Sequence, residues 1–514
     1  MREITVPSVR ELIDCAVEKY GKKTFIEYFE NNVLVKKSYK KIREDSLAVC
    51  RYLRAISKDH LHIALCGSTS YEYLVFATAS LISGCVLVPF APDISASEAS
   101  NLFKRADIDL IVHDAMLEDK VDEIINNTGI YLSPVNMTNK STFNRILSDY
   151  SESSEYASLS DYEVDMDELA LIIFTSGTTG IKKGVMHSTR TFVANTMCTD
   201  YVPYTTEKDT LLSVLPMYHV FCFSGDYVKN IRDGVTVALN GNMRDLTRNL
   251  LAFQPTAMRV VPMIAQTLLR AIKSLHAKNP SLTPRQAAEA VYGKNIKWLI
   301  SGGAYLPPEL CVEYENYGIY LRQGYGMSEA GCRITIPDTI CSLDSVGRVI
   351  DICDVRIKGG EIQVKTPSAM LGYYKMPEET KEMFTEDGWL RTGDIGVLAE
   401  NDELFITGRL KNLIILSSGE NVSPEAIEKK FNDIESISEV LVYAEKNMIV
   451  ADIYPNYSYF EDNKIENPEE VIISIVKEFN KTSKASHTIA KVNVLKTPLE
   501  RTGSGKIKRK VNSL

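Results

Sequence analysis

Hydrophobic and polar residues alternate along the first part of the chain with two different periods. Apolar residues spaced three and four positions apart predict amphipathic helices over residues 9–20 and 39–56. Short apolar runs such as HIAL, VLVPF and DLIVH predict buried strands between the helical patterns. Because helices that alternate with buried strands are typical of parallel sheets with crossover helices, we expect an α/β fold.

The longest uncharged stretch, residues 73–91, has about the length of a bilayer span. Gly84 and Pro89 interrupt it, and three hydroxyl residues dilute its apolar character. These interruptions favour a helix that ends before Gly84, followed by a buried strand over residues 85–88. We therefore expect no transmembrane segment.

The pattern changes twice in the second part of the chain. Short strands and turns from Gly359 onward predict a small β-rich unit. Residues 412–514 then hold two helical patterns, over 424–432 and 468–481, and a strand pair across EVLVYAEKNMIVADIYP. We predict a large N-terminal domain, residues 1–409, with α/β layers and a β-rich subdomain, and a small α+β C-terminal domain, residues 410–514. The acidic, serine-rich segment 151–167 is interpreted as a solvated connector.

Composition narrows the class of protein only moderately. With 514 residues, 45% of them hydrophobic, the chain can bury the cores of several domains. Its net charge of −9 argues against bulk binding of nucleic acid but allows a local basic pocket. The ten cysteines form no CxxC pair and no zinc-spaced cluster, and with no secretory leader expected we predict free thiols and a cytoplasmic location. His60 and His62 have the spacing of strand-borne metal ligands, although a lone HxH is more often incidental.

The segment LIIFTSGTTGIKKGVMH, residues 171–187, joins an apolar run to glycines, hydroxyl residues and lysines. Glycines let the backbone approach a phosphate closely, and hydroxyl and N–H groups bond its oxygens. A Walker A loop would need glycine where Lys182 stands, so an ordinary P-loop NTPase is disfavoured. The segment predicts a phosphate-binding loop after a buried strand over 171–174, with a purely structural turn as the alternative.

Five further stretches follow: LPMYHVFCF (215–223), SGGA with QGYGMSEAG (301–331), GWLRTGDIG (388–396), GRLKNLIILSSGENVSPEAIE (408–428) and PLERTGSGKIKRK (498–510). In this order, together with the glycine-rich loop, they resemble the adenylate-forming superfamily of acyl-CoA synthetases, amino-acid adenylation domains and luciferases. The resemblance covers nearly the whole chain. The strings SVLPMYH, QGYGMSE, MLGYYK and GENVSPEAIE look most similar to the bacterial long-chain fatty-acid–CoA ligases. The resemblance implies a mobile C-terminal domain and the use of ATP, Mg²⁺ and coenzyme A.

The resemblance also implies a nucleotide site. It assigns the nucleotide to the loop and to later motifs, through Thr175, Ser176, Gly177, Thr178, Thr179, Gly180, Lys183, Gly303, Ala304, Tyr325, Gly326, Asp394 and Arg409. The loop and Lys183 are expected to hold the β- and γ-phosphates, and Tyr325 is expected beside the adenine ring. Asp394 would accept hydrogen bonds from the ribose hydroxyls, assisted by Arg409. Considered alone, Asp394 and Arg409 would be interpreted as a turn aspartate and a solvated arginine.

Four residues are assigned catalytic roles by the same resemblance: Lys506, Glu329, Ser328 and Lys411. Glu329 is the expected Mg²⁺ ligand, because a hard carboxylate suits a cation that also binds phosphate oxygens. Ser328 replaces the commoner threonine and keeps the hydroxyl expected to face the α-phosphate. Lys411 matches the hinge about which the C-terminal domain rotates between the two half-reactions.

Lys506 is the residue expected to promote adenylation. Its ammonium would reach both the substrate carboxylate and the α-phosphate, and would stabilise the anionic transition state. Because Lys508, Arg509 and Lys510 follow directly, the alternative is a basic tail in solvent.

The resemblance places the acyl substrate against Met217, His219, Phe221 and Gly302. His219 is expected to act as an aromatic gate, with a structural histidine as the alternative. Amino-acid-activating relatives usually carry an aromatic–Asp pair here that holds the substrate ammonium. MYHVFCFS contains no aspartate before Asp226, so a plain carboxylic acid fits better.

We expect an AMP-forming acyl-CoA ligase that acts on a medium- or long-chain fatty acid. The carboxylate would attack the α-phosphorus of ATP, pyrophosphate would leave, and the acyl-adenylate would acylate the thiol of coenzyme A. Three alternatives stay open: an aryl acid as substrate, transfer to the phosphopantetheine of an acyl carrier protein, and a catalytically silent nucleotide-binding regulator. Neither the length of the acyl chain nor the oligomeric state follows from the sequence.

Overall fold

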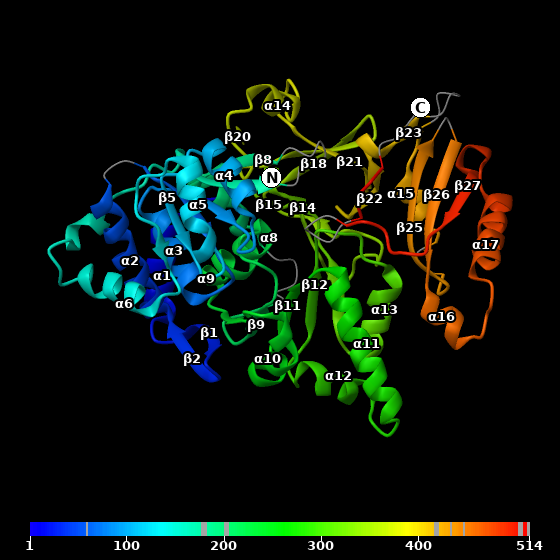
Figure 1. Ribbon diagram of the computed structural model, residues 1–514, viewed down its shortest axis with the longest axis horizontal. Coiled ribbons are helices and arrows are strands. Elements are labelled where there is room, and N and C mark those ends of the chain that lie inside the picture. The colour runs from blue at the N-terminus through cyan, green and yellow to red at the C-terminus, as the bar shows by residue number, and fades with distance from the viewer. Residues whose placement is uncertain are drawn as a thin grey trace.

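The computed structural model of the protein describes residues 1–57, 60–175, 182–199, 205–415, 421–431, 434–445, 448–501 and 507–510. The first part of the chain (blue to cyan) and the C-terminal unit (orange to red) lie at opposite ends of the molecule, and further α/β layers (green) and a small β-rich subdomain (yellow) lie between them (Figure 1). This arrangement is the predicted mixed α/β fold.

The first large sheet carries the predicted phosphate loop. Its seven strands run in the order β20-β8-β7-β4-β3-β5-β6. Their bounds are β3 (His62–Cys66), β4 (Val86–Phe90), β5 (Leu110–His113), β6 (Val135–Asn136), β7 (Leu169–Thr175), β8 (Lys183–Ser188) and β20 (Gly372–Tyr373). Strands β3 to β7 pair in parallel, whereas β8 and β20 add antiparallel pairs at one edge.

The second large sheet has the order β13-β12-β11-β9-β10-β1-β2. Its strands are β1 (Thr24–Glu30), β2 (Val33–Ser38), β9 (Thr210–Ser213), β10 (Thr236–Leu239), β11 (Ala257–Val260), β12 (Trp298–Ser301) and β13 (Tyr320–Gln323). All neighbours pair in parallel except the hairpin of β1 and β2. The expected rhythm of parallel strands and crossover helices is therefore confirmed.

Helices cover both faces of each sheet. Between the sheets lie α1 (Val9–Tyr20), α2 (Tyr39–Ile56) and α3 (Tyr71–Ile82), whose side chains share one hydrophobic core with both sheets. The outer face of the first sheet packs against α4 (Ala96–Arg105) and α5 (Glu118–Thr128). The outer face of the second packs against α10 (Leu246–Phe253), α11 (Pro262–Lys278), α12 (Pro284–Tyr292) and α13 (Pro308–Asn316). The helices predicted over residues 9–20 and 39–56 are confirmed at both ends.

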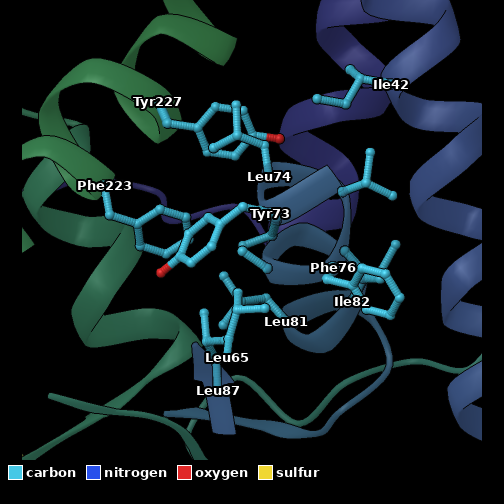
Figure 2. Close-up of a cluster of buried hydrophobic side chains, with 14 of the residues drawn as sticks. Ile42, Leu65, Tyr73, Leu74, Phe76, Leu81, Ile82, Leu87, Phe223 and Tyr227 are labelled. Carbon is cyan, nitrogen blue, oxygen red and sulfur yellow. The ribbon is translucent and has the colours of Figure 1, made fainter. Parts of the chain in front are cut away.

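The uncharged stretch 73–91 forms most of α3 and the whole of β4, as the predicted helix followed by a buried strand. Every side chain of α3 is buried, which explains why the helix is apolar on all sides. Figure 2 shows Tyr73 and Leu74 of α3 facing Phe223 and Tyr227, which lie on the π-helical turn η2 (Phe223–Val228). In the part of the chain that the structure describes, no helix combines the length and the apolar character that a membrane crossing requires.

Residues 151–167 are exposed or half-buried apart from Ser160, as the prediction of a solvated connector expects, but the segment is also anchored at one turn. After α6 (Lys140–Asp149) the segment contains the 3₁₀ helix η1 (Ala157–Asp161). The hydroxyl of Ser160 is buried and accepts a hydrogen bond of 3.1 Å from Nε of Arg51 on α2. The segment therefore docks on α2, because an arginine from a distant helix satisfies its polar groups.

The β-rich subdomain is an antiparallel sheet in the order β18-β19-β21-β22. Its strands are β18 (Asp354–Lys358), β19 (Glu361–Lys365), β21 (Leu390–Leu398) and β22 (Leu404–Arg409). Short elements surround it and link it to the α/β layers: β14 (Gly326–Met327), η4 (Ser328–Ala330), β15 (Cys332–Arg333), β16 (Thr335–Ile336), β17 (Arg348–Val349) and α14 (Pro377–Glu382). The change of pattern at Gly359 is confirmed as a change of architecture.

The C-terminal unit has its own hydrophobic core. Its strands are β25 (Ile437–Glu445), β26 (Met448–Pro455) and β27 (Ile489–Val494), and its helices are α15 (Pro424–Glu428), α16 (Tyr457–Asp462) and α17 (Pro468–Thr482). The predicted strand pair and the helix over 468–481 are confirmed. The helix predicted over 424–432 ends at Glu428 instead, and the sequence patterns missed α16 and β27.

In the described part of the chain, contacts between the C-terminal unit and the rest of the protein include the following two. Oγ of Ser423 donates a hydrogen bond of 2.9 Å to the carbonyl of Thr407 on β22. The ammonium of Lys429 lies 5.5 Å from the ring centroid of Tyr305, which follows β12. Between the units, the 3₁₀ turn η5 (Leu410–Asn412) leads to a short pair of strands, β23 (Ile414–Ile415) and β24 (Asn421–Val422).

Candidate active site

Strands β7 and β8 hold the two ends of the predicted phosphate loop side by side. Thr175, the last residue of β7, pairs with Lys183, the first residue of β8. The hydroxyl of Thr175 donates a hydrogen bond of 3.5 Å to the Lys183 carbonyl. Ser176, Gly177, Thr178, Thr179 and Gly180 lie outside the described residues, so their predicted contacts with phosphate stay predictions.

Glu329 lies on η4, close to β20. Its Oε1 accepts a hydrogen bond of 2.7 Å from the Tyr373 hydroxyl, and its carbonyl accepts one of 2.8 Å from the Met370 N–H. The same segment of chain, just before and within β20, therefore fixes both the backbone and the carboxylate of Glu329.

His187 supports the neighbouring residue, Ser328, from the protein interior. Nε2 of His187 lies 2.8 Å from the Ser328 carbonyl, and Nδ1 lies 3.1 Å from Oγ1 of Thr191. Because a carbonyl only accepts hydrogen bonds, Nε2 must carry the proton. Burial lowers the pKa of His187 to about 4, so the imidazole is neutral near pH 7.

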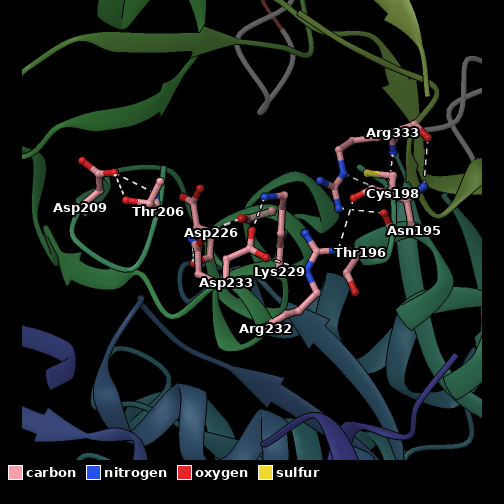
Figure 3. Close-up of polar contacts among 12 residues, drawn as sticks. Asn195, Thr196, Cys198, Thr206, Asp209, Asp226, Lys229, Arg232, Asp233 and Arg333 are labelled. Carbon is pink, nitrogen blue, oxygen red and sulfur yellow. Dashed lines mark hydrogen bonds and ion pairs between the residues drawn. The ribbon is translucent and has the colours of Figure 1, made fainter. Parts of the chain in front are cut away.

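Asn195 anchors the same turn from the other side (Figure 3). Its amide nitrogen donates to the carbonyls of Ala330, at 3.3 Å, and Arg333, at 2.9 Å. Nε of Arg333 donates in return to the Asn195 side-chain oxygen at 3.1 Å. Asn195 belongs to α7 (Thr189–Thr196), the helix that follows β7 and β8. This helix therefore holds η4 through buried hydrogen bonds.

Asp394 forms the second polar centre of the site. It lies buried on β21, where Oδ2 accepts a hydrogen bond of 2.6 Å from the Tyr325 hydroxyl and Oδ1 accepts one of 2.5 Å from Nε of Arg409. Burial and the charge of Asp394 raise the pKa of Tyr325, so the phenol keeps its proton and donates. Asp394 is therefore a buried, bonded residue of a strand, whereas Arg409 pairs with it and keeps an exposed side chain, so their roles at a nucleotide stay predictions.

The two centres are electrostatically linked. Although burial opposes the charge of Arg409, Asp394, Tyr325 and Glu329 together raise the pKa of its guanidinium. Tyr325 and Glu329 are four residues apart in the motif YGMSE, which explains how one short segment reaches both.

Glu361 supports the bend that carries Asp394. Its buried carboxylate accepts hydrogen bonds from Nε2 of Gln363 at 2.9 Å, from Arg391 at 3.1 Å and from the Gly393 N–H at 3.2 Å. The Thr392 hydroxyl adds a bond of 2.7 Å to the Ile362 carbonyl. The sequence patterns did not single out Glu361, because its role depends on a bend 32 residues further along the chain.

Gly326 and Gly303, two of the predicted glycines, lie where the backbone favours glycine for different reasons. A Cβ atom on Gly326 would lie 1.6 Å from the Cys332 carbonyl oxygen, so β14 and β15 can approach this closely only with glycine there. Gly303 has φ +77°, in the left-handed region, and the Ala304 carbonyl accepts a hydrogen bond of 3.1 Å from Gln323. These positions shape the backbone beside Tyr325.

The predicted acyl residues divide into two groups. Phe221 lies against Gly302, since a Cβ on Gly302 would be 2.9 Å from Cζ of Phe221. Met217 is buried in the core between the sheets, and its N–H donates to Thr69 at 3.2 Å. His219 is exposed at the start of the short helix α8 (Val220–Cys222). The structure brings Phe221 and Gly302 together but leaves the gate role of His219 a prediction.

Asp226, the first aspartate after this segment, is fully buried and already bonded. Its carboxylate accepts hydrogen bonds from Arg259 at 2.5 Å and from the Ser213 hydroxyl at 2.9 Å. A Cβ on Gly225 would lie 2.8 Å from Nε of Arg259, so the glycine makes room for the guanidinium. Figure 3 shows Asp226 on the helical stretch that continues into α9 (Lys229–Asp233), where Lys229 pairs with Asp233.

Lys411 lies on the exposed turn η5, between β22 and the C-terminal unit, where a hinge was predicted. Lys506 lies outside the described residues. The basic residues after it are exposed, as the alternative of a basic tail expects, but two of them form ion pairs: Arg509 donates to both oxygens of Glu428, at 2.7 and 2.6 Å, and Lys510 pairs with Asp452 at 2.6 Å.

The HxH pair is accounted for by hydrogen bonds to the backbone. Nδ1 of His60 lies 2.6 Å from the Gly84 carbonyl, and Nδ1 of His62 lies 2.6 Å from the Ala106 carbonyl. Within the described residues no cluster of three or more histidine, cysteine or carboxylate side chains is arranged to hold a metal ion. These two histidines therefore cap neighbouring loops.

Two family models match the chain. Residues 13–374 match the family described as AMP-binding enzyme, and residues 411–513 match the AMP-binding enzyme C-terminal domain. The protein belongs to the AMP-binding enzyme family, which confirms the resemblance to adenylate-forming enzymes.

Curated relatives with sequence similarity are ligases. 4-Coumarate–CoA ligase 1 of Arabidopsis thaliana is 27% identical, over 74% of this chain and 71% of that protein. Long chain acyl-CoA synthetase 1 of the same plant is 26% identical, over 82% and 74%. Its chloroplastic long-chain-fatty-acid–acyl-carrier-protein ligase is 24% identical, over 96% and 82%. Other matches are partial: the match to the peroxisomal long chain acyl-CoA synthetase 6 spans 46% of that protein, about half its length.

Solved structures share the fold. ATP-bound MatB from Rhodopseudomonas palustris superposes with a TM-score of 0.82 at 23% identity, over 97% of both chains. The anthranilate CoA ligase AuaEII in complex with anthranoyl-AMP superposes with a TM-score of 0.81 at 15% identity, over 99% of this chain and 97% of that one. The likeness establishes a large N-terminal α/β domain with a smaller C-terminal domain.

Proposed function

We propose that the protein is an AMP-forming acyl-CoA ligase that activates a medium- or long-chain fatty acid. The observation that carries the proposal is a pair of polar clusters. In one, Tyr373 contacts both Glu329 and Lys183. In the other, Asp394 accepts hydrogen bonds from Tyr325 and Arg409. Together they offer a cation, a hard carboxylate and a paired aspartate beside an aromatic ring, which suits a metal-bound nucleoside triphosphate.

In this proposal each group has one task. Lys183 binds phosphate oxygens of ATP, Asp394 accepts hydrogen bonds from the ribose, and Tyr325 lies beside adenine. Glu329 would hold Mg²⁺ through Oε2, which receives no hydrogen bond from any residue that the structure describes. When bound, the ion supplies charge neutralisation for the phosphates. Ser328, the loop 176–180 and Lys506 keep the roles implied by the resemblance.

The residues around the predicted acyl site, from Met217 to Asp226, support a carboxylic acid without an α-ammonium group as the substrate. An amino-acid substrate needs a carboxylate with room for its ammonium, and Asp226 is enclosed by Arg259 and Ser213. Phe221 instead presents an apolar ring beside Gly302. A fatty acid fits this surface, and an aryl acid is the alternative.

Coenzyme A is the proposed thiol acceptor. The second candidate is a carrier-protein phosphopantetheine, which is favoured by one observation: the relative described as an acyl-carrier-protein ligase matches over 96% of this chain. Both acceptors present the same thiol, so the two functions share the first half-reaction.

A panel of carboxylic acids, scored by pyrophosphate release, tests the proposal. Fatty acids of medium and long chain should give the highest rates, and coenzyme A should accelerate turnover by removing the acyl-adenylate. Acceleration only by a phosphopantetheinylated carrier protein would select the second candidate. Highest turnover with an α-amino acid, or no pyrophosphate release with any acid, would contradict the proposal.

A further inference from the structure

Tyr373 lies between the two charged groups of the proposed ATP site. Its hydroxyl is 2.7 Å from Oε1 of Glu329, and its ring centroid is 4.7 Å from the Lys183 ammonium. The side chain is buried, with 4% of its surface exposed. One residue therefore contacts both the proposed metal ligand and the proposed phosphate ligand.

Strand pairing explains why Tyr373 reaches Lys183. On the antiparallel pair of β20 and β8, Tyr373 is opposite Val185. Side chains two positions apart on a strand point to the same face, so Lys183 lies on the same face as Val185 and diagonally across from Tyr373. The Tyr374 N–H fixes this register with a bond of 2.8 Å to the Gly184 carbonyl.

A second set of bonds fixes Tyr373 toward Glu329. Met370, three residues earlier, donates its N–H to the Glu329 carbonyl at 2.8 Å. The N–H of Tyr373 itself donates to Oγ1 of Thr380 at 2.8 Å, which holds β20 against α14. The phenol therefore meets the carboxylate in a fixed direction.

The hydroxyl of Tyr373 acts as a donor. Its hydrogen bond to Oε1 of Glu329 runs from the phenol to the carboxylate, because a carboxylate oxygen only accepts. The proton therefore stays on the oxygen, and the bond to the carboxylate is a charge-assisted one. That bond engages Oε1 and leaves Oε2 of Glu329 for a cation.

The ring of Tyr373 gives Lys183 a partner other than a carboxylate. Ammonium groups are attracted to the face of an aromatic ring when they lie within about 6 Å of its centroid. Lys183 and Glu329 carry opposite charges, yet within the described residues each contacts Tyr373 and no ion pair joins the two. Tyr373 separates them by contacting each one differently.

We propose that Tyr373 is a positioning residue that keeps the Glu329 carboxylate and the Lys183 ammonium apart, each directed at one part of a metal–nucleotide complex. The inference rests on the proposed function, because it takes Glu329 as a metal ligand and Lys183 as a phosphate ligand. Partners that orient a metal ligand typically contribute about 10–100-fold to metal affinity. Loss of both the hydroxyl and the ring of Tyr373 would let the Glu329 carboxylate and the Lys183 ammonium pair with each other.

Two substitutions separate the tasks of the hydroxyl and the ring. Tyr373→Phe removes the donor to Glu329 and keeps the ring under Lys183, whereas Tyr373→Leu removes both. Tyr374→Phe is the matched control, because the hydroxyl of the adjacent Tyr374 donates to Asp107 at 2.6 Å, away from Glu329. Thermal unfolding of each variant checks that it is folded.

The experiment measures the binding of Mn²⁺ in the presence of a non-hydrolysable ATP analogue. Electron paramagnetic resonance detects the bound Mn²⁺. We expect Tyr373→Phe to bind Mn²⁺ about 10-fold more weakly, while its affinity for the analogue in EDTA stays at the wild-type value. Tyr373→Leu should also lose affinity for the analogue in EDTA, since Lys183 is then free to pair with Glu329. Tyr374→Phe should match the wild type in both measurements.

Each remaining outcome decides against the inference. Wild-type Mn²⁺ affinity in Tyr373→Phe overturns it while leaving the proposed function intact, and so does an equal loss in Tyr374→Phe. If the wild type itself binds no Mn²⁺ with the analogue, the proposed function fails and the inference fails with it.

Discussion

His187 and Glu361 show how single buried side chains set the geometry of the candidate site. Each contacts the backbone next to a predicted ligand, His187 at the Ser328 carbonyl and Glu361 at the Gly393 N–H. His187 is 141 residues from its partner in the sequence. Patterns of apolar spacing carry no information about such distant pairs, so neither residue could be recognised before the fold was known.

The neutral state of His187 predicts a dependence of stability on pH. The pKa is about 4 in the folded protein and 6.5 when unperturbed, so between these values the unfolded chain binds a proton that the folded protein excludes. The free energy of unfolding should therefore fall as the pH drops from 6.5 toward 4, by up to about 1.4 kcal/mol per pH unit.

His187→Gln keeps a donor for the Ser328 carbonyl and removes the titrating group. Thermal unfolding at pH 7.0, 6.0 and 5.0 should show a smaller loss of stability for the variant than for the wild type. Parallel loss in both proteins would mean that other groups cause the pH dependence.

Asp394 is predicted to contribute strongly to nucleotide affinity. Asp394→Asn removes the charge that pairs with Arg409 and weakens the acceptor for the ribose, so ATP should bind about 10–100-fold more weakly. Asp387→Asn is the control, since Asp387 forms an exposed ion pair with Arg356 on the same subdomain, and such pairs contribute little. Isothermal titration with ATP measures both; equal affinities for the two variants would remove Asp394 from the site.

At the scale of elements, those that were predicted in the large domain match the structure more closely than those predicted in the small domain. α1, α2 and β4 carry their own apolar pattern, and their predicted bounds are correct to within a few residues. The strand β27 reads IAKVNV, with polar residues inside it, and it forms because it pairs with β26. Its structure depends on a neighbour, which a local pattern does not include.

The C-terminal segment 507–510 is a docked element rather than a tail. Ile507 packs against a small apolar cluster around Tyr443, and the Arg501–Ile507 bridge joins the two arms that flank residues 502–506. Arg509 and Lys510 then pair with buried carboxylates on α15 and β26. The bonds hold both ends of the segment that carries Lys506.

Glu428→Gln is expected to loosen this element. It removes the charge that binds Arg509 through two hydrogen bonds, and should lower the free energy of unfolding of the C-terminal domain by about 2 kcal/mol. Limited proteolysis near residue 501 should become faster. Glu500→Gln, which disrupts only the exposed pair with Lys508, should change neither measurement noticeably, and a similar effect of both variants would contradict the docking.

At the scale of the whole molecule, the two domains are joined through the turn η5. The described contacts across the junction include one hydrogen bond from Ser423 and the Lys429–Tyr305 contact. We propose residues 410–514 as the moving unit, with Lys411 as the hinge, because a domain rotation is absorbed by a few residues between two units.

Lys411→Pro tests the hinge. Proline fixes φ near −65° and restricts Leu410, so the variant should be held in one arrangement, with adenylation near normal and thioester formation depressed. Pyrophosphate exchange and acyl-CoA production are measured separately, with Lys411→Ala as the control for loss of the side chain. Equal loss of both activities would indicate misfolding, and no loss of either would place the hinge elsewhere.

The two-residue strand β20 has a consequence for synthesis of the protein. It covers the edge of β8, but roughly 180 residues separate Ser188 from Gly372, and a ribosome adding about 5–20 residues per second needs roughly 10–40 s to make them. Throughout that interval the nascent chain presents β8 as an open edge next to a highly apolar sheet, a surface on which other chains can add strands. Chaperone capture of ribosome-bound chains should therefore be strongest after residue 188 emerges and should decline once residue 374 has left the exit tunnel.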